Sequence, residues 1–157
     1  MSNEILLHVR HLLETIEHAT VATVSVEGQP WNTPVYFARD QSALYWTSRS
    51  DAQHSINVRD NGHAFLVIYD SAGEDASGAA VYLDASVAEL TDEPAVDRAL
   101  GRIYRRRRKT HPAASRFIAP SVHRVYHATV RRAWTNVLHS AADSPWDQRI
   151  EIVFTEV

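Results

Sequence analysis

The sequence has 157 residues, of which 45% are apolar and 22% charged, ordinary proportions for a single globular domain over 1–157. It contains no cysteine, which excludes disulfides, thiolate metal sites and cysteine nucleophiles. The net charge of −3 gives no overall field that would favour nucleic acid as a partner.

The N-terminal segment predicts an amphipathic helix over 4–17, with Ile5, Val9 and Leu12 among the apolar residues at helical spacing. The segment has neither the basic leader nor the apolar run of a signal peptide. No window holds the roughly 18 apolar residues that a membrane span needs. We therefore expect a cytoplasmic protein without a membrane partner.

A change to β-rich composition follows this helix. The pattern predicts a hairpin of strands 20–26 and 31–39 around a turn at 27–30, and then a strand over 43–47. Ser50 and Asp51 are good N-cap residues for a short helix over 50–61, and Asn61-Gly62 is a helix-stop signal.

The second half of the chain predicts a buried strand over 63–69, a polar loop over 71–78 and a long strand over 79–90. A helix begins at 91–94, where Pro94 fits the first turn, and covers 92–109. The C-terminal strands, within 122–155, are expected at 122–128, 133–138 and 149–155. Tight turns between strands favour an antiparallel barrel over a doubly wound sheet.

One long stretch, continued by two shorter ones, resembles the pyridoxamine 5′-phosphate-oxidase-like proteins. It reads VATVSVEGQPWNTPVYFARDQSALYWTSRSDAQHSINVRDNGHAFLVIYD, and AVYLDASVAEL and RRAWTN continue the likeness. The resemblance implies a mainly β fold, an antiparallel split β-barrel of the FMN-binding type with flanking helices. It also implies a homodimer that carries FMN at the subunit interface.

A proline marks the strand expected beside the flavin ring. Pro34 cannot donate to a β-ladder, so its strand must be unpaired there, at an edge or a bulge. In the resembling proteins the following backbone, here Val35, Tyr36 and Phe37, lies along the isoalloxazine. The alternative is that Pro34 merely protects an edge strand from aggregation.

The phosphate is expected where the strand over 43–47 leads into the short helix. Trp46, Thr47 and Ser48 end that strand, Arg49 brings a charge, and Gln53, His54 and Ser55 open the helix. The vitamin-B6 oxidases place basic residues where this chain has Gln53, His54, Thr33 and Ala38, so fewer full charges would hold the phosphate. The alternative is a capped surface helix.

Trp134 and Asn136 are candidates for the rim of the cofactor, although most buried tryptophans belong to the core. The substrate-gripping motif of the B6 oxidases is not reproduced at 146–149. We therefore do not expect pyridoxine-phosphate oxidation.

The sequence gives no support for a metal site or for a serine-hydrolase activity. The histidine pairs His8/His11 and His123/His127 lack a third ligand at standard spacing, and there is no Gly-x-Ser-x-Gly motif. The basic run 105–109 suits a helix C-terminus and could help to bind an anionic ligand or the partner subunit.

The preferred hypothesis is an FMN-dependent oxidoreductase that passes hydride or electrons to a small molecule, with catalytic residues unassigned. A deazaflavin coenzyme could replace FMN. The alternatives are a non-catalytic flavin-, deazaflavin- or haem-binding protein, acting as carrier, buffer or stress responder, and an interaction module with a vestigial site.

Overall fold

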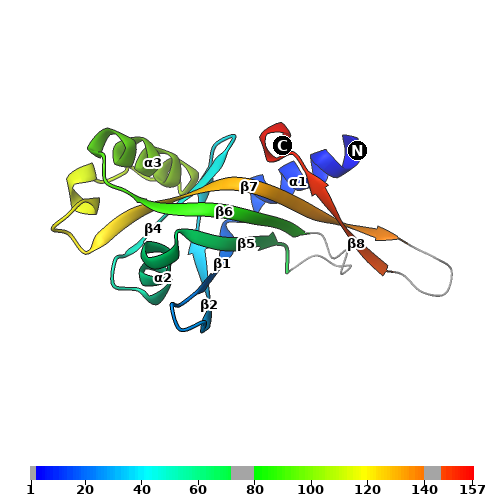
Figure 1. The fold of residues 1–157 in the computed structure, drawn as a ribbon. Helices are drawn as coiled ribbons and strands as arrows, with labels where there is room; N and C mark the ends of the chain where they lie inside the picture. The colour runs from blue at the N-terminus through cyan, green and yellow to red at the C-terminus, as the bar shows by residue number, and fades with distance from the viewer. Residues whose placement is uncertain (1–2, 72–79, 140–145) are drawn as a thin grey trace.

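The computed structural model describes residues 3–71, 80–139 and 146–157, which form three α-helices, two short 3-10 helices and eight strands (Figure 1). The helices are α1 (Asn3–Thr15), α2 (Gln53–Asn61), α3 (Glu93–Arg106), η1 (Ala114–Phe117) and η2 (Phe154–Glu156). The strands are β1 (His18–Val24), β2 (Pro30–Tyr36), β3 (Ala38–Arg39), β4 (Ala43–Arg49), β5 (His63–Tyr69), β6 (Ala80–Leu90), β7 (His123–His139) and β8 (Trp146–Ile152).

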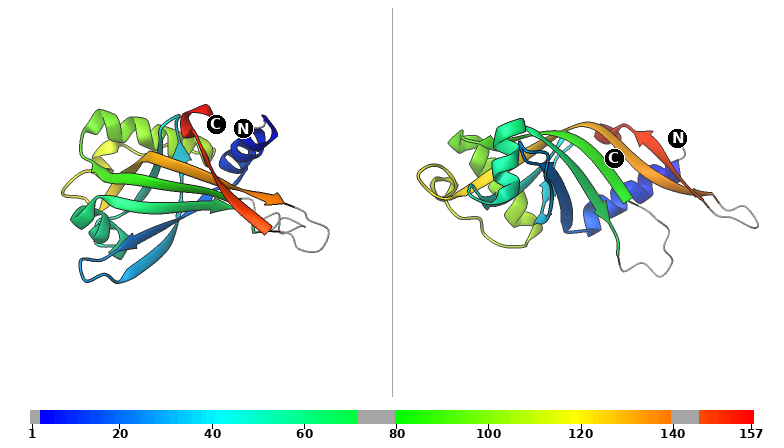
Figure 2. Two further views of the ribbon diagram at one scale, coloured as in Figure 1. Left: turned by 45° about the vertical axis from the view of Figure 1, so that its right-hand side comes forward. Right: turned by 60° about the horizontal axis from the view of Figure 1, so that its bottom comes forward.

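All the strands belong to one antiparallel sheet, in the order β2-β1-β5-β6-β7-β4-β3, with β8 added to β7. The two ends of this order, β2 and β3, are separated in the chain by Phe37 alone. The sheet must therefore curl until its ends meet, which gives the split β-barrel seen in Figure 2. Pro34 lies on β2, which is an end strand of the sheet, as the sequence predicts.

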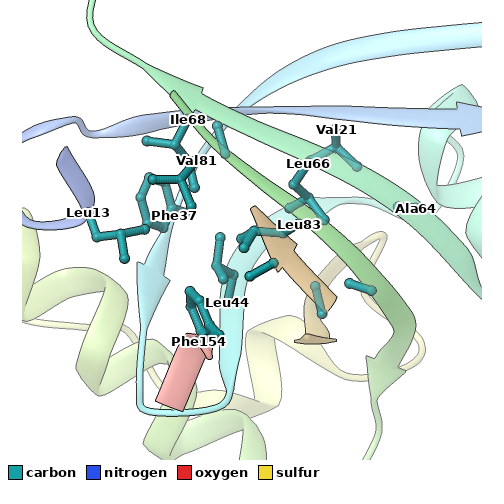
Figure 3. Close-up of a cluster of buried hydrophobic side chains, with 14 of the residues drawn as sticks. Leu13, Val21, Phe37, Leu44, Ala64, Leu66, Ile68, Val81, Leu83 and Phe154 are labelled. Atoms are coloured by element: carbon teal, nitrogen blue, oxygen red, sulfur yellow. The ribbon is translucent and has the colours of Figure 1, made fainter. Parts of the chain in front are cut away.

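The concave side of the sheet holds the main core. β1 and β5 alternate buried and less buried residues, which places Val21, Leu66 and Ile68 inside with Phe37 and Leu83 (Figure 3). Three buried residues of α1 join the same cluster, namely Val9, Leu12 and Leu13. A second cluster forms between α3, β3, β7 and η1.

Several predicted boundaries are confirmed. Gly62 adopts φ 67° and its N–H donates to the Val58 carbonyl, which ends α2. The Asp92 side chain accepts a hydrogen bond from the Ala95 N–H at the start of α3. The loop predicted over 71–78 lies almost entirely outside the described residues, and no helix of the described residues is long and apolar enough to cross a membrane.

The C-terminal strands differ from the prediction. The strands expected at 122–128 and 133–138 form one 17-residue strand, β7. A β-bulge explains the error, because Asp84 and Ala85 of β6 pair with Arg132 and Val130, so Arg131 pairs with no residue in the β6–β7 ladder. The last strand runs over Trp146–Ile152 rather than 149–155.

The bulge also changes which residues of β7 face the core. Tyr126 and Ala128 are buried on the concave side before it, whereas Ala133 and Thr135 are buried after it. The inward positions therefore switch from even to odd numbers, so the sequence lacks the continuous alternation of a single strand.

Candidate functional site

The first turn of α2 is the centre of the candidate site. Its N-cap is Ala52, which has an extended backbone and makes no side-chain cap hydrogen bond. The prediction that Ser50 and Asp51 cap this helix is therefore wrong. Asp51 instead accepts two hydrogen bonds from Arg49, at 2.9 and 2.7 Å, so the N–H groups of the first turn receive no side-chain cap.

Buried polar atoms without partners lie on α2 and on the neighbouring β4. His54 and Ser55 are only 5% and 1% exposed, yet His54 Nε2 and Ser55 Oγ have no hydrogen-bond partner. Trp46 Nε1, on β4, is also buried and unpartnered, and its ring stacks on Tyr126 with centroids 5.8 Å apart. Such orphaned groups cost free energy unless a ligand satisfies them, so they mark a candidate binding site.

Two electrostatic effects are visible in this cluster. Burial lowers the pKa of His54, which favours its neutral imidazole near neutral pH. Burial raises the pKa of Tyr126, and the nearby Ser55 hydroxyl opposes this shift without reaching the geometry of a full hydrogen bond. Neutral donors are therefore the groups that this part of the site offers.

A buried amide fixes α2 against the barrel. Gln53 Nε2 donates to Asn57 Oδ1 at 2.8 Å, and Asn57 Nδ2 donates to Thr23 Oγ1 of β1 at 3.0 Å. Asn57 is fully buried, so this chain of hydrogen bonds orients the first turn of α2.

A pocket of about 440 Å³ opens beside Thr47 on the other face of β4. Its remaining lining residues come from the end of α3, the following loop and the start of β7: Tyr104, Thr110, His111, Pro112, Arg116, Phe117 and His123. The sequence reasoning assigned no ligand role to this set. Its imidazoles, guanidinium and hydroxyls suit a polar small molecule.

The segment predicted along the flavin ring turns its side chains in two directions. Val35 and Phe37 point into the main core, whereas Tyr36 packs against α3. The Arg107 guanidinium lies over the Tyr36 ring, 4.2 Å from the ring centroid. Backbone groups of the edge strand, rather than the side chains of Val35 and Phe37, are what this segment can present to a ligand.

Trp134 and Asn136 lie far from the rest of the predicted set. Val125 pairs with Thr47, and Trp134 is nine residues further along β7. Because the bulge adds one residue to β7, the same stretch covers eight residues of β6, from Leu90 to Tyr82, which is about 26 Å along the strand at about 3.3 Å per residue. One flavin cannot touch both positions of the same chain, so the structure does not bring these two residues together with β4 and α2.

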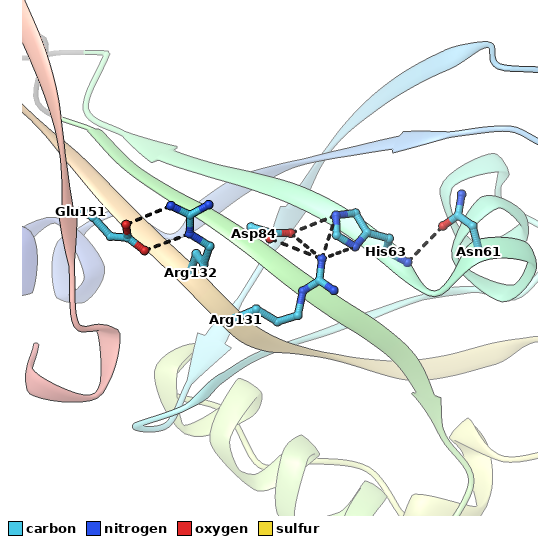
Figure 4. A network of polar contacts seen from close by, with 6 residues as sticks. All are labelled: Asn61, His63, Asp84, Arg131, Arg132 and Glu151. Atoms are coloured by element: carbon cyan, nitrogen blue, oxygen red, sulfur yellow. Dashed lines mark hydrogen bonds and ion pairs between the residues drawn. The ribbon is translucent and has the colours of Figure 1, made fainter.

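Trp134 instead belongs to the convex face of the sheet. Its ring lies 6.1 Å from Phe65, which lies 6.4 Å from Tyr82, and Arg132 stacks on Trp134 at 4.7 Å. Around these rings, Asp84 contacts both His63, at 2.9 Å, and Arg131, at 3.1 Å, and Arg132 pairs with Glu151 at 2.9 Å (Figure 4). We call the residues of these contacts the convex aromatic face.

The histidine pairs His8/His11 and His123/His127 lie on α1 and β7. Within the described residues, no group of three His, Cys, Asp or Glu side chains is placed to hold a metal ion.

Comparisons with known proteins give the family and the fold. The family model of pyridoxamine 5′-phosphate oxidase matches residues 7–135. The haem storage protein HutZ from Vibrio cholerae has a similar structure, with a TM-score of 0.70 and 12% identity over 83% of this chain and 94% of that chain. A haem-binding protein from Mycobacterium smegmatis has a TM-score of 0.65 and 20% identity, over 94% of this chain and 59% of that chain. An F420 reductase has a TM-score of 0.59 and 18% identity, over 79% of this chain and 94% of that chain.

No curated protein matches the sequence. The structural neighbours are too distant in sequence to show more than the shared fold. The family match, in contrast, spans more than half of the chain and agrees with the split barrel. The chain belongs to the pyridoxamine 5′-phosphate oxidase family.

Proposed function

We propose that this protein binds FMN and passes hydride or electrons between the flavin and a small molecule. The observation that carries the proposal is the set of buried, unpartnered donors, His54 Nε2, Ser55 Oγ and Trp46 Nε1, beside a helix start without a side-chain cap. Backbone N–H groups at a helix N-terminus and neutral donors suit a phosphate. The residues present therefore fit the phosphate end of FMN.

When bound, the flavin would supply the redox chemistry. The chain would hold the phosphate through α2 with Ser48, and would place the edge-strand backbone of Val35–Phe37 along the ring. Thr47, on the other face of β4, would face the substrate pocket. Arg49 contributes little charge because Asp51 already neutralises it. We expect moderate rather than tight flavin affinity for this reason.

We further propose that two copies of the chain complete the site. The convex aromatic face carries rings and arginines, the residue types that are enriched in protein interfaces. A second copy could bring its own Trp134 and Asn136 to the flavin, which the first copy cannot do across about 26 Å. A homodimer therefore accounts for the whole predicted set of cofactor residues.

The substrate would occupy the pocket beside Thr47. Arg116, His111 and His123 favour a polar or anionic molecule there. The absence of the C-terminal B6-oxidase motif argues against pyridoxine phosphate, and no residue is assigned as catalytic acid or base.

A non-catalytic haem-binding role is the second candidate. Two imidazoles, His111 and His123, line one pocket, and imidazole is a common haem ligand. Two of the similar structures are of proteins described as storing or binding haem. A deazaflavin in place of FMN follows from the likeness to the F420 reductase.

Native mass spectrometry combined with absorbance spectroscopy tests these proposals. We expect a dimer that retains FMN and shows flavin absorbance, and we expect Gln53→Ala and His54→Ala to weaken flavin binding. His127→Ala is the matched control, because His127 lies on β7 rather than on α2. A Soret band would favour haem, and unchanged FMN affinity in both α2 variants would remove the proposed phosphate site.

A further inference from the structure

A recess of about 740 Å³ lies between the end of α1, the start of β1 and the end of α3. Its lining residues are Glu14, Thr15, Glu17, His18, Tyr36, Arg106, Arg107, Arg108 and Lys109. The basic run at the end of α3 thus contributes four consecutive cations to one concave surface.

Two of the four cations are held in fixed orientations. Arg106 donates to the backbone carbonyls of Glu14 and Ile16 and lies 4.5 Å from the Phe37 ring centroid. Arg107 lies over the Tyr36 ring, at 4.2 Å. A guanidinium that is already ordered loses less conformational entropy when it binds an anion.

In the described parts of the chain, the positive charge of the recess has no carboxylate counterion, although Arg106 already donates to two carbonyls. Among the residues that the structure describes, none of the four cations has a carboxylate within ion-pair distance. The Tyr36 hydroxyl is buried and has no hydrogen-bond partner. Four cations against the two carboxylates of Glu14 and Glu17 leave a local excess of positive charge.

We propose that this recess binds a small oxyanion with two or more negative charges, either a phosphate ester or a polycarboxylate. Its concave shape suits a compact ligand. Glu14 and Glu17 on the same rim would repel an extended polyanion such as nucleic acid or an acidic membrane surface. The site does not include α2, so it is distinct from the proposed phosphate site of FMN.

Calorimetric titration of the full chain with pyrophosphate, and separately with citrate, tests the proposal. We expect wild-type protein to bind at least one probe, with affinity that falls as the salt concentration rises. Arg108→Gln/Lys109→Gln removes two exposed cations and should weaken binding roughly tenfold. Arg98→Gln/Arg105→Gln, two exposed cations of α3 outside the recess, is the matched control and should change affinity by less than about twofold.

Stronger binding of pyrophosphate indicates a phosphate ester, and stronger binding of citrate indicates a polycarboxylate. If neither probe binds to the wild-type protein, or if both double variants lose the same affinity, the proposal is overturned. Flavin absorbance of the same preparations is measured in parallel. Loss of anion binding in the recess and loss of flavin binding are therefore measured independently.

Discussion

Replacing His54 with leucine should stabilise the protein without flavin and weaken its binding of FMN. The buried Nε2 atom has no partner, and an unsatisfied buried polar group costs about 1–3 kcal/mol. Leucine has a similar volume and removes that cost, although imperfect packing returns part of the gain. We expect a net stabilisation of about 1–2 kcal/mol, or about 2–8 °C in Tm for a chain of this size.

The same substitution removes a donor from the proposed phosphate site. A hydrogen bond to a charged group contributes about 1.5–3 kcal/mol, so FMN affinity should fall roughly 10- to 100-fold. Urea and thermal unfolding of flavin-free protein measure the first effect, and quenching of flavin fluorescence during titration measures the second.

A second buried histidine provides the control. Burial also lowers the pKa of His127, but this residue lies on β7, so His127→Leu should leave FMN affinity unchanged. A flavin-free His54→Leu protein less stable than wild type, or one that binds FMN as tightly, would refute the reasoning.

Three further predictions concern pH, charge and assembly. Burial lowers the pKa of His54 in the folded protein below 6.5, its ordinary value in the unfolded chain. As pH falls, His54 therefore binds a proton more readily in the unfolded chain, and the free energy of unfolding decreases below about pH 6.5. Wild type should therefore lose more stability than His54→Leu between pH 7.5 and pH 5.5 in urea unfolding, and equal losses would count against a buried neutral imidazole. Asp51→Asn should free Arg49 and raise FMN affinity roughly two- to fivefold at low salt, with titration as the measurement. Phe65→Glu should convert the proposed dimer to monomers in native mass spectrometry, and a dimer that persists would exclude the convex aromatic face as the interface.

Local signals made much of the fold predictable. The β1–β2 hairpin, the glycine end of α2 and the Asp92 cap of α3 each depend on a few adjacent residues. Their physical causes, strand propensity, left-handed backbone and capping, act within one turn or one hairpin. β7 was misjudged because the bulge breaks the alternation on which the prediction relied.

The candidate site was harder to predict because its properties are tertiary. Thr47 was expected to contact the cofactor, but its pocket neighbours Tyr104 and Arg116 come from segments more than 50 residues away. The sequence predicted that Ser50 and Asp51 cap α2, but the Asp51 carboxylate accepts its hydrogen bonds from Arg49 instead. No sequence pattern reports that His54 is buried without a partner.

The bulge at Arg131 keeps the outer surface of β7 on its present side of the sheet. Arg131 is left out of the ladder with β6, so its removal would give a plain strand in which every later side chain of β7 keeps its side. Pairing the full-length strand without the bulge would instead move every later side chain to the opposite side of the sheet. The indole of Trp134 would then compete for the interior, and Ala133 would take its place towards solvent. The surface proposed for pairing of two copies therefore depends on one extra residue far from α2.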